Sequence, residues 1–146
     1  MAIDRQGTGL VIMRLCLGVF FIVQAATKLS WITDPSLLSS QLSLWVMNAA
    51  PGSIGQMYLQ TVAVPYAGVF ARLVPLGEFF CGFALLVGFF TPWFAFLAFF
   101  MVLNYQVASG TIFEWSFLAN RSALPILGST LALALGGGRL PWSLKG

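Results

Sequence analysis

Four long apolar stretches decide what this chain can fold into. They cover about residues 7–29, 69–90, 92–112 and 118–135. A transmembrane helix needs about 20 residues, because each residue advances about 1.5 Å along the axis and the hydrocarbon core is about 30 Å thick. The pattern therefore predicts an all-α membrane protein, a four-transmembrane antiparallel helix bundle that forms a single domain over residues 1–146.

The composition agrees with lipid as the main solvent. Hydrophobic residues make up 59% of the chain and charged residues 8%, whereas a soluble domain carries about 25% charged residues. The net charge of +3 comes from seven basic and four acidic residues. These charges are scattered singly, with no basic run or aromatic platform of the kind that binds nucleic acid. We therefore expect membrane lipids as partners, and no nucleic acid.

The chain contains no histidine, and this absence removes several kinds of chemistry. Axial haem ligation, most zinc sites and the activation of a serine or cysteine nucleophile all depend on imidazole. The two cysteines, Cys16 and Cys81, lie in separate apolar stretches and form no CxxC motif. We therefore expect no metal site, no covalent cofactor and no catalytic residue in this chain.

Turn signals between the stretches predict the path of the chain. Thr91-Pro92 separates the second stretch from the third, and proline suits the first turn of a new helix, so we predict a tight antiparallel hairpin there. The fourth stretch ends at three glycines, residues 136–138, followed by Arg139 and Pro141. Four crossings would place both termini on one side of the membrane.

Basic residues give a weak orientation signal. They are shared evenly between the two sides, with Arg5, Arg139 and Lys145 on the terminal side and Lys28, Arg72 and Arg121 on the other. The free amino terminus and the nearby Arg14 favour cytoplasmic termini. We expect the chain to be integral to a prokaryotic-type cytoplasmic (inner) membrane, and the first apolar stretch, which is too long for a signal peptide, to stay in the mature protein.

The one long connection, residues 30–68, is broken by proline and glycine but is not disordered in composition. Apolar residues recur at helical spacing between serines over residues 37–46, which predicts a short amphipathic, interfacial helical segment between spans 1 and 2. A second short helix is expected around residues 54–62. We expect both to cap one end of the bundle, where an entrance or lid would lie. The alternative is a surface connector anchored by tryptophan.

Charged residues inside the apolar stretches are the first candidates for function, since a charge at bilayer depth costs about 2.5 to 3.5 kcal/mol on insertion scales. Arg14 and Lys28 share one face of the first predicted helix. Glu78 is the one acid well inside a stretch, and antiparallel packing puts it closer in depth to Lys28 than to Arg14. We predict a Lys28–Glu78 ion pair, and we expect Arg14 to reach toward lipid phosphate at the opposite face.

Amide side chains extend this cluster. Gln24 precedes Lys28 by one helical turn, and Asn104 and Gln106 lie near the end of the third stretch. The candidate ligand-binding residues are therefore Arg14, Gln24, Lys28, Glu78 and Asn104. Two interpretations stay open: an interhelical clamp that fixes packing and binds nothing, and a polar pocket for a ligand or a quinone headgroup beneath the cap.

Small residues predict where helices approach closely. Gly77, Cys81, Ala84 and Gly88 form one stripe in the second stretch, and residues 128, 132 and 136 form another in the fourth. The fourteen phenylalanines are expected to face lipid. They would also suit the wall around an isoprenoid, carotenoid or pigment tail.

Three segments resemble the DoxX family of small four-helix membrane proteins in their order and spacing. They are RLCLGVFFIVQAATKL at residues 14–29, LGEFFCGFALLVGFFTP at residues 76–92 and GGRLPWSL at residues 137–144. The resemblance covers most of the chain outside residues 30–68. It implies four antiparallel helices and membership of membrane redox systems, including the membrane subunit of thiosulfate:quinone oxidoreductases. The matching positions are Arg14, Gly18, Lys28, Gly77, Glu78, Gly82, Gly88, Thr91, Arg139, Trp142 and Ser143.

Two functions of different classes follow as expectations. The first is an accessory subunit of a larger redox or energy-converting membrane complex, respiratory or photosynthetic, that stabilises the assembly and packs lipids, quinone or pigments beside other membrane subunits. A small bundle without a cofactor ligand can do little electron transfer alone, which favours this function. The alternative is a quinone-binding membrane subunit of a DoxX-type oxidoreductase. Any catalysis would be quinone-linked and shared with a partner.

Overall fold

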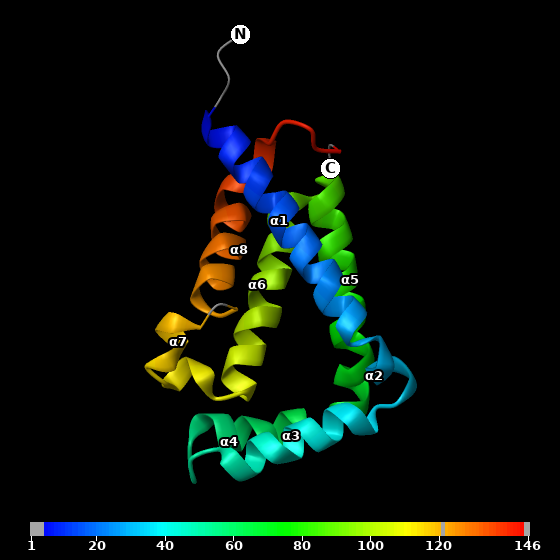
Figure 1. Cartoon of the computed structure of the whole chain (residues 1–146), viewed down its shortest axis with the longest axis vertical. Helices are drawn as coiled ribbons and strands as arrows, with labels where there is room; N and C mark the ends of the chain where they lie inside the picture. The colour runs from blue at the N-terminus through cyan, green and yellow to red at the C-terminus, as the bar shows by residue number, and fades with distance from the viewer. Residues whose placement is uncertain (1–4, 121, 145–146) are drawn as a thin grey trace.

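Four long helices and a crosswise cap make up the fold (Figure 1). The structure, a computed structural model, describes residues 5–120 and 122–144, and within these ranges it contains helices and turns but no strand. The long helices are α1 (Arg5–Thr27), α5 (Ala67–Val87), α6 (Thr91–Ala108) and α8 (Leu124–Gly136). The cap consists of α3 (Ser36–Asn48), α4 (Ile54–Tyr58) and the π-helix η1 (Leu59–Ala63). The short elements are α2 (Leu29–Thr33), η2 (Thr111–Phe113), α7 (Ser116–Ala119) and η3 (Gly137–Arg139).

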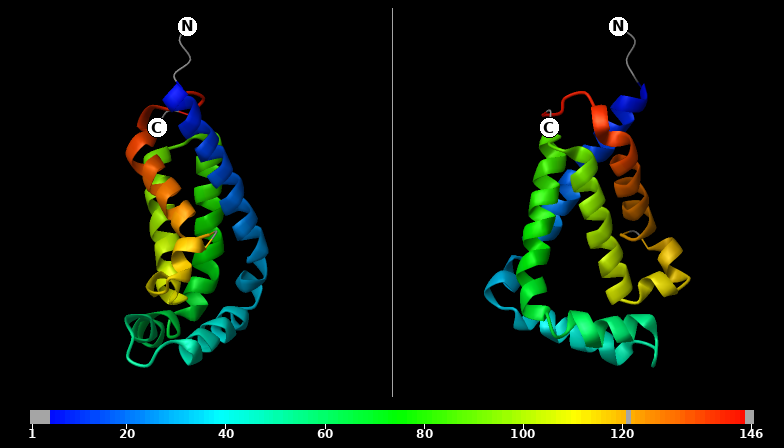
Figure 2. Two further views of the ribbon diagram at one scale, coloured as in Figure 1. Left: turned by 60° about the vertical axis from the view of Figure 1, so that its left-hand side comes forward. Right: turned by 180° about the vertical axis from the view of Figure 1, so that it is seen from behind.

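The long helices form two pairs that separate toward the cap. α1 packs along α5, and α6 packs along α8. The pairs meet at the hairpin between α5 and α6 and spread apart from there, so that the bundle is a wedge with the cap across its wide end (Figures 1 and 2). The start of α1 and the segment after α8 lie together at the narrow end.

Glycine lets α1 and α5 approach at backbone distance. A Cβ added at Gly82 of α5 would lie 2.8 Å from the backbone nitrogen of Ile22 and 2.9 Å from the carbonyl oxygen of Gly18. A Cβ added at Gly18 would lie 2.7 Å from the side chain of Leu86. The close approach to α1 is therefore made by Gly82, which is not a member of the predicted stripe, whereas Gly77 of that stripe faces Met101 of α6.

The predicted hairpin at Thr91-Pro92 is confirmed. α5 ends at Gly88, whose φ of 72° is the left-handed conformation that glycine adopts without steric cost. Phe90 is also left-handed, with a φ of 41°. α6 restarts at Thr91 with Pro92 in its first turn, where the missing N–H of proline costs no helical hydrogen bond.

The connection after α2 forms a helix where one was predicted, α3, and this helix lies across the wide end of the bundle (Figure 1). Leu38 and Leu42 are buried on one face and pack with residues of η1 and α5. The second predicted short helix appears as α4 followed by η1, and α4 begins at Ser53, whose side chain accepts a hydrogen bond from the backbone N–H of Gln56.

Three helices are long and apolar enough to cross a membrane: residues 6–27, 67–87 and 91–108. The fourth predicted span, residues 118–135, is wrong at its start. Asn120 accepts a hydrogen bond from the N–H of Ser122 in a turn, and α8 begins only at Leu124 with Pro125 in its first turn. Its 13 residues reach about 20 Å. The third span is also shorter than predicted, because Gly110, with a φ of 75°, follows the end of α6.

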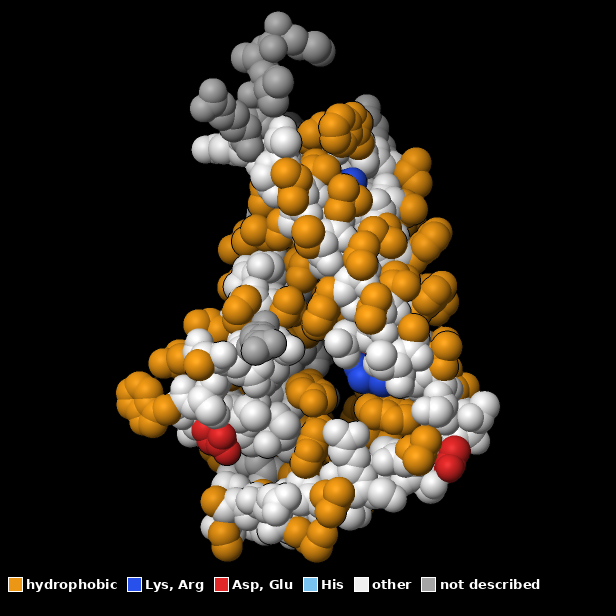
Figure 3. All heavy atoms as spheres, in the orientation of Figure 1, with side chains coloured by type: hydrophobic (Ala, Val, Ile, Leu, Met, Phe, Trp, Pro, Cys, Tyr) orange, Lys and Arg blue, Asp and Glu red, His pale blue; other side chains and the backbone are white. Residues whose placement is uncertain are grey.

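The outer faces of the long helices are apolar. Side chains such as Val19, Phe80, Trp93 and Leu135 are exposed, and on the face seen in Figure 3 apolar side chains are spread out rather than gathered in one patch. An apolar surface of this extent is stable in hydrocarbon and not in water. The chain is therefore built as an integral membrane protein.

We predict that Gly82→Ala destabilises the bundle, because the new methyl group would press on the backbone of α1. Overpacking of this kind costs about 1 to 3 kcal/mol, so the apparent melting temperature in detergent should fall. Gly68→Ala in the same helix is the control, since nothing lies within 4 Å of the position that its new methyl group would take. Equal melting temperatures for the two variants would contradict this account of the α1–α5 contact.

Candidate functional site

A cavity of about 580 Å³ lies between the two helix pairs, on the side closed by the cap. Figure 3 shows the molecule hollowed at this level, with a basic side chain beside the hollow. Most of the lining is apolar or aromatic. The apolar and aromatic lining residues are Phe20, Phe21, Trp31, Leu38, Leu42, Trp45, Tyr58, Ala63, Phe70, Leu73, Val74, Gly77, Leu97, Phe100, Met101, Val102, Tyr105 and Ala108.

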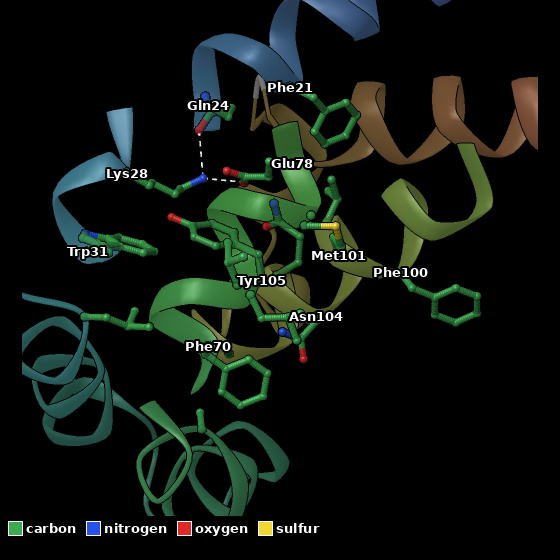
Figure 4. Close-up of a pocket in the computed structure, with 18 of the residues that line it drawn as sticks. Phe21, Gln24, Lys28, Trp31, Phe70, Glu78, Phe100, Met101, Asn104 and Tyr105 are labelled. Atoms are coloured by element: carbon green, nitrogen blue, oxygen red, sulfur yellow. Dashed lines mark hydrogen bonds and ion pairs between the residues drawn. The ribbon is translucent and has the colours of Figure 1, made fainter. Parts of the chain in front are cut away.

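One wall of this cavity carries an ion pair inside the bundle. Lys28 Nζ donates to Glu78 Oε1 at 2.5 Å and to Gln24 Oε1 at 3.3 Å (Figure 4). The pair is nearly buried, with side chains 13% and 11% exposed. Trp31 of α2 adds a ring 5.9 Å from Lys28 Nζ, within reach of a cation–π interaction. The predicted Lys28–Glu78 pair is thus confirmed, and Gln24 is its third member.

The other oxygen of Glu78 is left without a partner. Glu78 is 8% exposed, and its Oε2 is buried with no hydrogen-bond donor within reach among the described residues. A buried carboxylate oxygen without a donor costs free energy, because it has lost its water and gained nothing in return. An ion pair that served only to hold the two helices together would have this oxygen hydrogen-bonded as well.

Asn104 lies on the same cavity but bonds to the cap and not to the ion pair. Its Oδ1 accepts a hydrogen bond from the phenol of Tyr58 in α4. Burial raises the pKa of Tyr58 above its ordinary value, against a smaller lowering by this hydrogen bond. The phenol therefore remains protonated at neutral pH and ties the cap to α6 beside the cavity.

Gln106, the second amide of the third span, has a structural role in the turn after α6. Its side chain is 1% exposed, its Oε1 accepts from Thr111, and its Nε2 donates to the carbonyl of Ser122 at 3.4 Å. These bonds join the end of α6 to the start of α8. They leave little of the amide for a ligand.

Arg14 lies outside this cavity, and its expected contact with lipid phosphate is wrong. The side chain is 2% exposed; Nη1 donates to Ser143 Oγ at 2.6 Å and Nη2 to the carbonyl of Trp142 at 3.0 Å. The segment after α8 supplies these acceptors, so the guanidinium turns inward. Gly88 makes room for it, since a Cβ there would lie 2.2 Å from Nη1.

Three aromatic residues that complete the site were not predicted from the sequence. Trp31 is three residues after Lys28, a spacing that could have indicated their contact. Tyr58 and Tyr105 come from the connection and from α6, and no sequence pattern pointed to either. They depend on the position of the cap, and Tyr105 packs edge-on against Trp45 of α3 at 5.4 Å between ring centroids.

The described residues of this site offer polar groups around a cavity but no set of metal ligands. Over residues 5–120 and 122–144 no three histidine, cysteine, aspartate or glutamate residues come together to hold a metal ion. Cys16 is exposed and Cys81 buried, and both are free thiols. The available chemistry is one cation, one carboxylate, amides and phenols around an apolar space.

We predict that Lys28→Met destabilises the protein more than the double variant Lys28→Met/Glu78→Gln. The single change leaves a buried carboxylate unpaired, which costs about 3 to 5 kcal/mol, whereas replacing both charges avoids that penalty. Thermal unfolding in detergent measures the order of the three melting temperatures. Arg72→Met, at an exposed cation of α5, is the control and should change little. A double variant less stable than the single one would contradict this interpretation.

Comparison with known proteins gives one match. The DoxX family model matches residues 9–109, which include α5, α6, the cap and most of α1. Searches of curated proteins and of solved structures gave no significant match. Because the match covers more than half of the chain and includes Gln24, Lys28, Glu78 and Asn104, this integral membrane protein belongs to the DoxX family.

Proposed function

We propose that this chain is a membrane subunit that binds an amphipathic, quinone-type molecule. The head of the molecule would lie at Lys28, Glu78 and Gln24, and its tail along the aromatic walls between the helix pairs. One observation carries the proposal: the ion pair within the bundle lies on the wall of a mostly apolar cavity of about 580 Å³.

The size and lining of the cavity support a ligand of this class. Sites for small molecules and cofactors measure about 300 to 1,000 Å³ and combine apolar walls with a few placed polar groups. Phe21, Phe70 and Met101 supply such walls next to the polar cluster (Figure 4). An isoprenoid tail has the matching character, since it is apolar, flexible and soluble in the surrounding lipid.

The ion pair is better suited to a ligand than to a clamp. A clamp stabilises most when both partners have all their hydrogen bonds and are sealed among other side chains. Here Lys28 has two acceptors for three N–H donors, Glu78 has a free oxygen, and both residues line the cavity. These unfilled positions are those that a bound head would occupy.

The role of this chain in redox chemistry would be to bind and orient. A bound quinone accepts electrons and protons, and the quinol so formed releases them. A partner subunit would supply the redox centre, because the donor set of this cavity holds no group of metal ligands among the described residues. Lys28 and Glu78 would fix the head in one position. The apolar walls would keep water away from it. We place the protein in a prokaryotic cytoplasmic membrane with its termini in the cytoplasm.

An accessory role in a larger redox or photosynthetic complex is the second candidate, and α8 favours it. Gly128 is exposed, with nothing within 4 Å of where a Cβ would lie, and Ala132 and Gly136 lie on neighbouring turns. In the second span the glycine that faces α1, Gly82, is covered by that helix. At Gly128 there is no such cover among the described residues, and small residues let the backbone of another membrane helix approach closely.

The first test is ligand retention. The wild-type chain, purified from native membranes in mild detergent, should carry an isoprenoid quinone in near-stoichiometric amount, detected by mass spectrometry of the solvent extract. Val74→Trp places an indole in the cavity and should reduce retention at least about tenfold, because the new side chain fills space that the ligand needs. Val69→Trp, at an exposed position on the same helix, is the control and should retain it. Equal retention, or a carotenoid or other pigment in place of quinone, would contradict the proposal.

The second test concerns partners. Gly128→Leu should remove co-migration with a large membrane partner in native mass measurement and leave the melting temperature of the isolated chain unchanged, since space around Gly128 is open. Gly68→Leu introduces the same side chain at an open site on α5 and should preserve co-migration. A self-sufficient wild-type oligomer without any partner would rule out the accessory role.

A further inference from the structure

We propose that the cavity takes its ligand by a hydroxyl group, the head of a quinol, in preference to the carbonyl head of a quinone. This inference rests on the proposed function and narrows it to one chemical form of the ligand. It is carried by the unpaired carboxylate oxygen of Glu78, together with the cavity on which that residue lies.

The carboxylate limits what can complete it. An ionised carboxylate only accepts hydrogen bonds, and Glu78 is ion-paired with Lys28 through Oε1. Oε2 has no donor among the described residues. A ligand that completes Glu78 must therefore bring an N–H or O–H group of its own.

A carbonyl head does not meet this requirement. A quinone oxygen is an acceptor, so beside Glu78 it would place one set of lone pairs against another and leave Oε2 without a partner. A hydroxyl is both donor and acceptor. It can donate to Glu78 and accept the third N–H of Lys28, which has two acceptors in the structure.

Gln24 does not change this preference. Its Oε1 is used by Lys28, and its amide nitrogen points away from Glu78 in Figure 4. A carbonyl placed at that nitrogen would gain one hydrogen bond but would leave the carboxylate oxygen as it is. The hydroxyl and carbonyl heads therefore still differ in whether they can donate a hydrogen bond to Glu78.

The oxygen reaches the ligand by a small rotation. Oε2 is occluded from the cavity in the structure, although the residue itself lines the cavity wall. The last torsion of a glutamate side chain is broad and roughly two-fold, so turning the carboxylate about it is inexpensive. Such a turn moves both oxygens, so the flexible side chain of Lys28 must follow Oε1 as Oε2 comes toward the cavity.

The test compares three compounds that share one alkyl tail and differ only in the head group. A decyl hydroquinone, its dimethyl ether and the corresponding quinone are titrated into the full chain in detergent, without oxygen, and binding is followed by quenching of tryptophan fluorescence, since Trp31 and Trp45 line the cavity. We expect the hydroquinone to bind at least about fivefold more tightly than either of the others, because they leave a buried acceptor unpaired. Glu78→Gln, which adds a donor at this position, should bring the affinities of hydroquinone and quinone within about twofold of each other.

The outcomes separate the two proposals. If none of the three compounds binds, or if Val74→Trp leaves all binding unchanged, the proposed function fails and this inference fails with it. If all three bind with equal affinity and Val74→Trp removes that binding, or if the quinone binds most tightly, the cavity is a ligand site and the hydroxyl preference alone is overturned. The wild-type ratio decides this even where Glu78→Gln does not fold.

Discussion

The backbone contact between α1 and α5 is the constraint on which the rest of the structure depends. Gly18 and Gly82 bring the two helices closer than side chains with a Cβ would allow. That approach sets the depth of Lys28 against Glu78, and so places a charged pair where each partner offsets the other's loss of water. The ion pair follows from the packing of small residues, rather than the packing from the charges.

The wedge shape follows from a second constraint, at the hairpin. Gly88 and Pro92 hold the ends of α5 and α6 together, while the cap keeps their other ends apart. The space left between the spread helix pairs, beneath the cap, is the cavity of about 580 Å³. The phenol of Tyr58 and the amide of Asn104 then tie the cap to α6 across its edge.

Local signals predicted the fold better than the site. The length of the apolar stretches predicted three of the spans, Thr91-Pro92 predicted the hairpin, and the serine-rich sequence of α3 predicted the cap. The depth of each charge along its helix predicted the Lys28–Glu78 pair. The start of α8 was missed although Pro125 marked it, because hydrophobicity outweighed a turn signal. Tyr58 and the inward turn of Arg14 could not be predicted, since each depends on contacts between segments far apart in the chain.

The bond between Arg14 and the segment after α8 has a consequence for biosynthesis. Arg14 enters the membrane with the first helix. Its hydrogen-bond acceptors, the carbonyl of Trp142 and the hydroxyl of Ser143, carry no charge and are translated 128 and 129 residues later. Until then the cation must keep water or lipid around it. A chain that ends before Trp142 would lack both acceptors, so the first helix obtains the hydrogen bonds of its buried cation only from the end of the described chain.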